Sequence, residues 1–199
     1  MFYLAEYPED PPGYVNLSTS TEWEPWLNGV IPAALHADVR GRLRSNLKHI
    51  LVGLEMKAAL IVPHATRISG RSVLFEPYCQ IMTFEFCVGV FSVCEGIGSA
   101  FWLRNQNDDG AAAARIAPNN WIGALVAVAD PHGALDLDIK VRGVKATRDK
   151  IHQDQLGART EIDWHAFDYG QSFVPAKDAL AILLQVNAGD VPVATNLRP

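Results

Sequence analysis

The sequence has 199 residues, of which 49% are hydrophobic and 20% charged, and it carries a net charge of −5. This length suits one domain with a sizeable core, and the composition excludes an intrinsically disordered chain. The acidic balance also argues against a protein that coats nucleic acid non-specifically. We therefore expect a single globular domain over residues 1–199.

The first 32 residues are rich in proline and aromatic residues, which predicts an irregular arm lying against the domain. Their first ten, MFYLAEYPED, lack the basic and long apolar regions of a secretory signal peptide. Cys79, Cys87 and Cys94 are odd in number and lack C-x-x-C spacing, so we interpret them as buried thiols in a reducing compartment. We expect a cytoplasmic protein.

Two long helices are predicted next, over residues 33–62 and 77–105. In the first, apolar residues recur every three or four positions, which is the pattern of an amphipathic helix, and Pro63 ends it. In the second, the run FCVGVFSVCEGIGSAFWL (86–103) contains one charged residue, Glu95. A membrane span is one interpretation of this run. The central Glu95, the glycines and the absence of a flanking basic cluster favour a covered helix of a bundle and no membrane.

The second half of the chain predicts shorter helices over residues 121–129 and 176–186. Between them, LDLDIKVR (135–142) alternates apolar and polar residues, which is typical of a strand, but its apolar residues also fit a helical seam. We favour a helix there because helices lie on either side and no partner strand is evident. The fold class expected is therefore all-α, a bundle of four to five helices over residues 33–190.

Nine of the 17 basic residues fall in two short stretches, 40–48 and 140–150. Such stretches either present a local basic face to an anionic ligand or are ordinary solvated helix faces. The second stretch continues into VRGVKATRDKIHQDQLGART (141–160), which holds the one cluster that suggests chemistry, namely Arg148, Asp149 and His152.

On a helical wheel, Arg148 falls on the seam with Val141, where an apolar residue is expected, and His152 follows four residues later on the same face. A guanidinium on an apolar seam needs a partner, because an unpaired buried charge costs several kcal/mol. One interpretation is that Arg148 pairs with a carboxylate, Glu95 or Asp149, and holds helices together. The other is that Arg148 and His152 face a cleft and meet a phosphate there.

Arg148-Asp149 followed by His152, late in a small helical chain, resembles the signature of the HEPN superfamily. In that superfamily an Arg, usually followed by a polar residue, precedes a His by four to six intervening residues, whereas three intervene here. The resemblance covers residues 33–155. It implies a helical bundle that commonly dimerises, so that two Arg/His faces share a cleft, and many members are metal-independent endoribonucleases, often toxins with an antitoxin partner.

Carried over residue by residue, the resemblance implies that Arg148, Asp149 and His152 are catalytic. A His titrating near neutrality suits a general base for the ribose 2′-hydroxyl, and an Arg suits the phosphate charge. Further residues are expected to bind RNA phosphates or to orient the pair: Lys145, Arg142 and Lys150 for phosphate, and Glu95 as the orienting acid.

The sequence therefore predicts a homodimer that binds RNA or a nucleotide, with no metal and no other cofactor. A non-catalytic helical interaction module, with Arg148 in a structural ion pair, is the alternative from another class. A weaker one is a metal protein built on Glu161, Asp163 and His165 of EIDWH.

Overall fold

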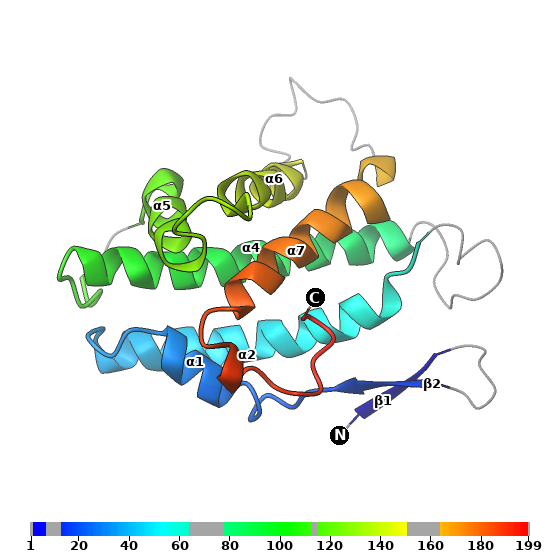
Figure 1. Cartoon of the computed structure of the whole chain (residues 1–199), viewed down its shortest axis with the longest axis horizontal. Coiled ribbons are helices and arrows are strands. Elements are labelled where there is room, and N and C mark those ends of the chain that lie inside the picture. The colour runs from blue at the N-terminus through cyan, green and yellow to red at the C-terminus, as the bar shows by residue number, and fades with distance from the viewer. Residues whose placement is uncertain (1, 7–12, 64–77, 113–114, 151–163, 199) are drawn as a thin grey trace.

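The computed structural model describes residues 2–6, 13–63, 78–112, 115–150 and 164–198. The chain is an all-α bundle, as the sequence predicts (Figure 1). The α-helices in the described part of the chain are α1 (Glu24–Val30), α2 (Ala37–Leu60), α4 (Tyr78–Asn105), α5 (Pro118–Ala129), α6 (Leu137–Asp149) and α7 (Val174–Leu184).

Helix α4 lies at the centre of the bundle, in contact with α2, α5, α6 and α7 (Figure 1). Its buried residues are distributed around the whole helix, which explains why the sequence from Phe86 to Leu103 is apolar at nearly every position. Helix α2 runs antiparallel to it, since Leu54 lies beside Gly89 and Leu43 beside Gly96. The helices predicted over residues 33–62 and 77–105 are confirmed, with ends that differ by at most four residues.

Glycine allows α5 to approach α4 very closely at one point. A Cβ added to Gly98 would lie 2.6 Å from the backbone carbonyl oxygen of Trp121 and 3.0 Å from its ring. Trp121 is fully buried there and stacks edge-to-face on Phe91, with ring centroids 5.5 Å apart. A glycine inside a helix is normally destabilising, and this close contact is the reason for it here.

Helix α6 resolves the ambiguity at residues 135–142 in favour of a helix. Leu137, Val141 and Val144 are buried, as helical spacing requires, whereas Ile139 is 69% exposed. A half-buried strand would have buried Ile139 together with Leu137 and Val141. The favoured interpretation is confirmed.

The N-terminal arm contains more regular structure than the irregular segment we expected. Strands β1 (Phe2–Glu6) and β2 (Gly13–Leu17) form an antiparallel hairpin, with Phe2 paired to Leu17. Helix α1 follows with Pro25 in its first turn, where proline's missing N–H is not needed. Trp26 of α1 is fully buried and donates its indole N–H to the carbonyl of Val186 (2.8 Å). The arm is therefore fastened to the domain through its tryptophans.

Helix α7 and the aromatic segment before it close one side of α4. Helix α7 begins two residues earlier than the range predicted from sequence, 176–186, and ends two residues earlier. Upstream, Phe167 and Phe173 are buried, with Phe173 against Phe86 of α4 (ring centroids 4.8 Å apart). Aromatic residues in this segment thus serve as packing at the edge of the bundle.

Within the described residues, Tyr78–Asn105 is the one helix whose length and composition would allow it to cross a membrane, and 61% of its most apolar window is buried inside the bundle. A core helix meets the same criterion. The neighbouring helices cover α4 in the manner that the bundle interpretation predicts.

The Gly98→Ala variant should lower the free energy of unfolding by about 1–3 kcal/mol, because a new methyl group must displace the α5 backbone. Gly123→Ala is the matched control in α5, since a Cβ there meets nothing within 4 Å, and it should stabilise by about 0.5–1 kcal/mol. Urea unfolding of both variants checks this. Equal stability of the two would contradict the close approach of α4 and α5.

Candidate functional site at the carboxyl end of helix α6

Helix α6 is oriented by an acid that lies before it in the chain. Asp130, the residue directly after α5, is buried, and its carboxylate accepts hydrogen bonds from the backbone N–H groups of Leu135 (3.2 Å) and Leu137 (3.2 Å). The residue directly before α6, Asp136, has left-handed backbone with φ 55° and no side-chain cap. Asp130 therefore satisfies the N–H of the first residue of α6 and holds the turn directly before the helix.

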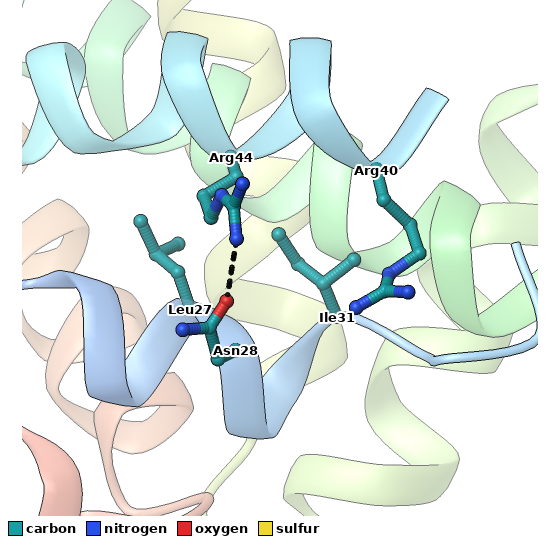
Figure 2. A pocket seen from close by; sticks show the side chains of 5 residues that line it. All are labelled: Leu27, Asn28, Ile31, Arg40 and Arg44. Atoms are coloured by element: carbon teal, nitrogen blue, oxygen red, sulfur yellow. Dashed lines mark hydrogen bonds between the residues drawn. The ribbon is translucent and has the colours of Figure 1, made fainter. Parts of the chain in front are cut away.

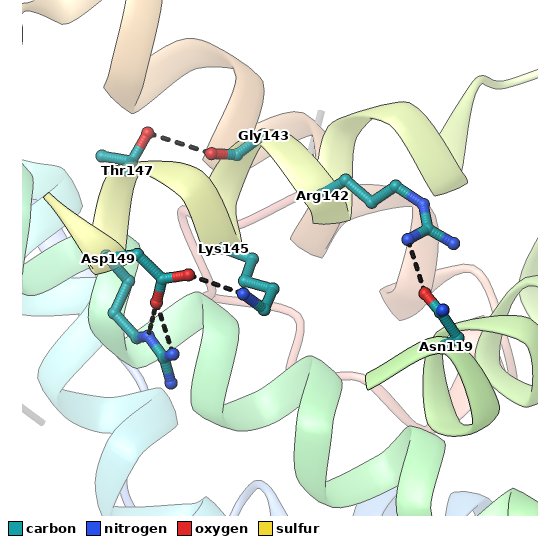
Figure 3. Close-up of polar contacts among 7 residues, drawn as sticks. Asn119, Arg142, Gly143, Lys145, Thr147 and Asp149 are labelled. Atoms are coloured by element: carbon teal, nitrogen blue, oxygen red, sulfur yellow. Dashed lines mark hydrogen bonds and ion pairs between the residues drawn. The ribbon is translucent and has the colours of Figure 1, made fainter. Parts of the chain in front are cut away.

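The carboxyl end of α6 brings together Lys145, Arg148 and Asp149, which we call the α6 cluster. Asp149 Oδ1 accepts from Arg148 Nε (2.9 Å) and Nη2 (2.5 Å), and Asp149 Oδ2 lies 2.5 Å from Lys145 Nζ. Figure 3 shows Lys145 reaching along the helix to Asp149. The side chains are 25–32% exposed, so the cluster lies at the edge of the core and is open to solvent on one side.

Two cations on one carboxylate determine its protonation. Partial burial by itself would raise the pKa of Asp149, but hydrogen bonds from Lys145 and Arg148, and their charges, outweigh burial and hold this pKa below its ordinary value. Asp149 is therefore ionised at neutral pH. The cluster carries one net positive charge, because two cations share a single anion.

The guanidinium of Arg148 also lies against α4. Its central carbon is 4.2 Å from the ring centroid of Phe91, which is the geometry of a cation–π contact. Arg148 therefore faces α4, as the helical wheel predicts. Its side chain is only partly buried, however, and the neighbouring Thr147 is the residue buried at this end of α6. Among the described residues Glu95 makes no hydrogen bond or ion pair with Arg148, so Asp149 is the carboxylate that the seam position required.

The remaining basic residues of α6 point elsewhere. Arg142 is exposed and binds Asp138 (2.9 Å) and the side-chain oxygen of Asn119 in α5 (2.9 Å), as Figure 3 shows for Asn119. Lys150, just after the helix, has its Nζ 5.7 Å from the ring centroid of Phe167. Of the predicted phosphate-binding residues, the structure thus places only Lys145 beside Arg148.

The predicted His152 lies outside the described residues. Helix α6 ends at Asp149, and Lys150 is its cap. Arg148 and Asp149 are brought together, and the position of the motif histidine remains a prediction.

The other basic stretch is occupied by contacts between α1 and α2 and leaves little room for a ligand. Arg44 donates to the side-chain oxygen of Asn28 (2.9 Å) and Lys48 pairs with Glu24 (3.2 Å). Figure 2 shows Arg44 directed at Asn28, with Arg40 beside Ile31. The cavity lined by Arg40, Arg44 and the facing residues of α1 measures about 10 Å³, which is space for about one water molecule. This stretch is therefore a helix–helix contact.

The described residues offer no group of three or more His, Cys, Asp or Glu side chains placed to hold a metal ion. Glu161 and Asp163, of the weaker metal hypothesis, lie outside them. Cys87 and Cys94 are buried free thiols, and burial raises the pKa of each to about 12. Thiols in this state are poor nucleophiles and poor metal ligands, which agrees with their interpretation as packing residues.

Sequence reasoning missed two residues that shape the site. Phe91 was one apolar residue among many in α4, and only the packing angle of α6 brings it under Arg148. Asp130 stands five residues before Leu135, too far for the local capping patterns that a sequence reveals. A third missed residue, Glu55, is fully buried in α2 away from this cluster; its position four residues after the buried Leu51 was the available signal.

Comparison with known proteins gave no matching family model, no similar curated protein and no similar solved structure. The all-helical architecture is shown by the structure. No family match supports the HEPN resemblance, which rests on Arg148, Asp149 and His152 of the sequence alone.

Asp149→Asn should cost about 0.5–1 kcal/mol of stability at neutral pH, a value suited to a partly exposed ion pair. Because the pKa of Asp149 is lowered in the folded chain, this contribution is fully present above the ordinary value of 3.8 and is lost as pH falls through the lower folded value. Urea unfolding of both proteins between neutral and acid pH measures it, since urea does not screen charge.

Asp138→Asn is the matched control. The side chains of Asp138 and Arg142 are both nearly half exposed, so their ion pair should contribute only about 0.3–0.5 kcal/mol to the free energy of unfolding. A difference between wild type and Asp149→Asn that persists unchanged into strong acid would contradict the ion-pair assignment.

Proposed function

We propose that this chain is a HEPN-like helical protein that binds RNA through the α6 cluster and cleaves it without a metal, using Arg148 and His152. The single observation that supports the proposal is the geometry of Arg148. Asp149 accepts two hydrogen bonds from the guanidinium at a partly exposed edge of the core, and Lys145 donates a hydrogen bond to the other oxygen of the same carboxylate.

A guanidinium held in this way is suited to a phosphate. Arginine has five N–H donors, and two of those of Arg148 go to Asp149, so within the described part of the chain the other three are available to phosphate oxygens. The orientation is set before a ligand arrives, because the Phe91 ring supports one face of the guanidinium. Pre-orientation of this kind lowers the entropic cost of stabilising charge on a phosphate.

The ribonuclease chemistry assigns separate tasks to the motif residues. His152, as a general base, would take the proton of the ribose 2′-hydroxyl, whose oxygen then attacks phosphorus. The bond from phosphorus to the 5′-oxygen breaks, which leaves a 2′,3′-cyclic phosphate, and water supplies the proton to the leaving 5′-oxygen. Arg148 would stabilise the charge that develops on the phosphate oxygens, and Asp149 would orient Arg148. Lys145 would bind a neighbouring phosphate. Arg142 and Lys150 are exposed but directed away from Arg148, so they would bind only phosphates further along the RNA.

A homodimer would complete this proposal, because two copies of the α6 cluster across a two-fold axis would give one basic cleft. An antitoxin would then be a protein that covers that cleft. We expect the active protein to sediment as a dimer. We also expect it to act in the cytoplasm.

A second candidate, a non-catalytic helical module, is favoured by one specific observation. Arg148 has its charge partner in the adjacent Asp149 and an aromatic partner in Phe91. These contacts are sufficient to explain a guanidinium on the seam, and they join α6 to α4. In this candidate the α6 cluster is a structural joint, and the chain acts through partner binding.

Cleavage and binding of a fluorescently labelled single-stranded RNA, with and without EDTA, distinguish the two candidates. The nuclease proposal expects cleavage that EDTA does not affect, and a loss of at least about 100-fold in His152→Ala, the smallest contribution typical of a general base. Arg148→Ala should lose cleavage and reduce the salt dependence of binding by about one charge, and Arg148→Lys should not restore cleavage.

Arg40→Ala is the matched control on α2 and should behave as wild type. Thermal unfolding of each variant completes the comparison. The proposal is wrong if wild type cleaves no RNA or if His152→Ala cleaves normally. A drop of several degrees in the melting temperature of Arg148→Ala without any RNA activity in wild type would establish the structural joint instead.

A further inference from the structure

Glu55 is a fully buried acid at a junction of three parts of the chain. It lies on α2, and its Oε2 accepts the backbone N–H of Ser18, the residue that follows β2 (2.6 Å). Its backbone carbonyl accepts from the side-chain amide of Asn196 in the C-terminal segment (3.0 Å). One residue of α2 therefore fastens the segments at both ends of the described chain.

Cations are absent from the immediate partners of Glu55 in the described structure. Its contacts are with Ser18, Thr195 and Asn196, which are neutral. Lys57 on the same helix pairs with Glu85, and Arg198 of the C-terminal segment donates to the carbonyls of Ala188 and Val191. The charged group that acts on Glu55 from the N-terminal segment is Glu22, which is also acidic.

Full burial of Glu55 without a cation among its described partners favours a protonated acid at this junction. In the described structure Glu55 Oε1, Ser18 Oγ and Asn196 Oδ1 are buried without a hydrogen-bond partner. A carboxylate can only accept hydrogen bonds, whereas the protonated acid also donates one. A proton on Glu55 therefore removes a fully buried charge that no cation among its described partners offsets, while Oε2 continues to accept from the Ser18 N–H.

We propose that Glu55 is a proton-controlled latch, which in its protonated form holds the N-terminal hairpin and the C-terminal segment against α2 and in its ionised form loosens both. This inference is independent of the RNA proposal, since Glu55 and the α6 cluster lie on different helices. It identifies a pH-sensitive device in the fold, with the two terminal segments as the parts that move.

Electrostatics agree with this geometry. Burial raises the pKa of Glu55 above its ordinary value of 4.5. The Ser18 N–H, which donates to Oε2, opposes the rise, as do the hydroxyl groups of Thr195 and Ser18 through their proximity to the carboxyl, although the Ser18 hydroxyl does not reach hydrogen-bonding geometry; Glu22 adds to the rise. An acid whose pKa is raised by folding holds its proton more tightly in the closed form. The latch is therefore strongest at acid pH and weakens as pH rises from about 4.5 to the pKa of the folded protein.

Amide hydrogen exchange of residues 13–18 and 191–198 tests the latch, with wild type compared to Glu55→Gln at each pH. Glutamine keeps the shape and the acceptor, adds donors and cannot ionise. The opening constant of wild type relative to Glu55→Gln should rise by up to about tenfold per pH unit within that window, because opening releases one proton. It should become constant above the window, and exchange in α7 should show no such difference.

Glu22→Gln is the carboxylate control and should retain the pH dependence, since Glu22 lies at the surface and only adds to the effect. The same pH dependence in wild type and Glu55→Gln would overturn the proposal. If Glu55→Gln does not fold, a carbon-13 titration of the glutamate carboxyl groups of wild type decides the matter. A carboxyl that titrates above the ordinary range supports the latch, and titration of every glutamate at or below 4.5 overturns it.

Discussion

The constraint on which this structure depends is that α4 is apolar around its entire circumference. A helix of this kind must be covered on every side, and α2, α5, α6 and α7 all pack against it. Three glycines on α4 set how closely the cover can approach, with Leu54 at Gly89, Leu43 at Gly96 and the α5 backbone at Gly98. The arrangement of the other helices is largely a consequence of covering α4.

The position of the α6 cluster follows from the same constraint. Helix α6 buries Leu137, Val141 and Val144 against the bundle, and at its end Arg148 reaches Phe91 while remaining partly exposed. A cation placed at the boundary between core and solvent can anchor a helix and can also meet an anionic ligand. Asp149 serves both roles, because it neutralises part of the charge and fixes the guanidinium. The two candidate functions thus share one geometry. They differ in whether the α6 cluster binds RNA and whether His152 acts as a general base.

Periodicity predicted α2, α4 and the helical state of residues 137–149, because burial on one face or on all faces leaves a direct trace in the spacing of apolar residues. The hairpin and α1 escaped prediction. Helix α1 has only seven residues, contains Pro25, and is stabilised by distant contacts, such as the Trp26 indole bond to Val186, and not by a local pattern. Tertiary contacts of this kind have no signature within a short window of sequence.

The site shows the same division. The seam position of Arg148 and its need for a carboxylate were predictable, and Asp149 was one of the two acids named. Arg148 pairs with Asp149 and not with Glu95 because of the way α4 and α6 pack, which the sequence does not reveal. Phe91 and Asp130 act through the packing of α6 and the path of the preceding loop, which sequence spacing does not encode.

Native-state hydrogen exchange of the α4 amides is the most direct test of the central claim. If the other helices cover α4 on all sides, its central amides should exchange only through global unfolding, with an opening free energy equal to that from urea denaturation. Exchange of the central α4 amides well below the global value, at the level of chain ends, would contradict the claim that α4 is the enclosed core of the bundle.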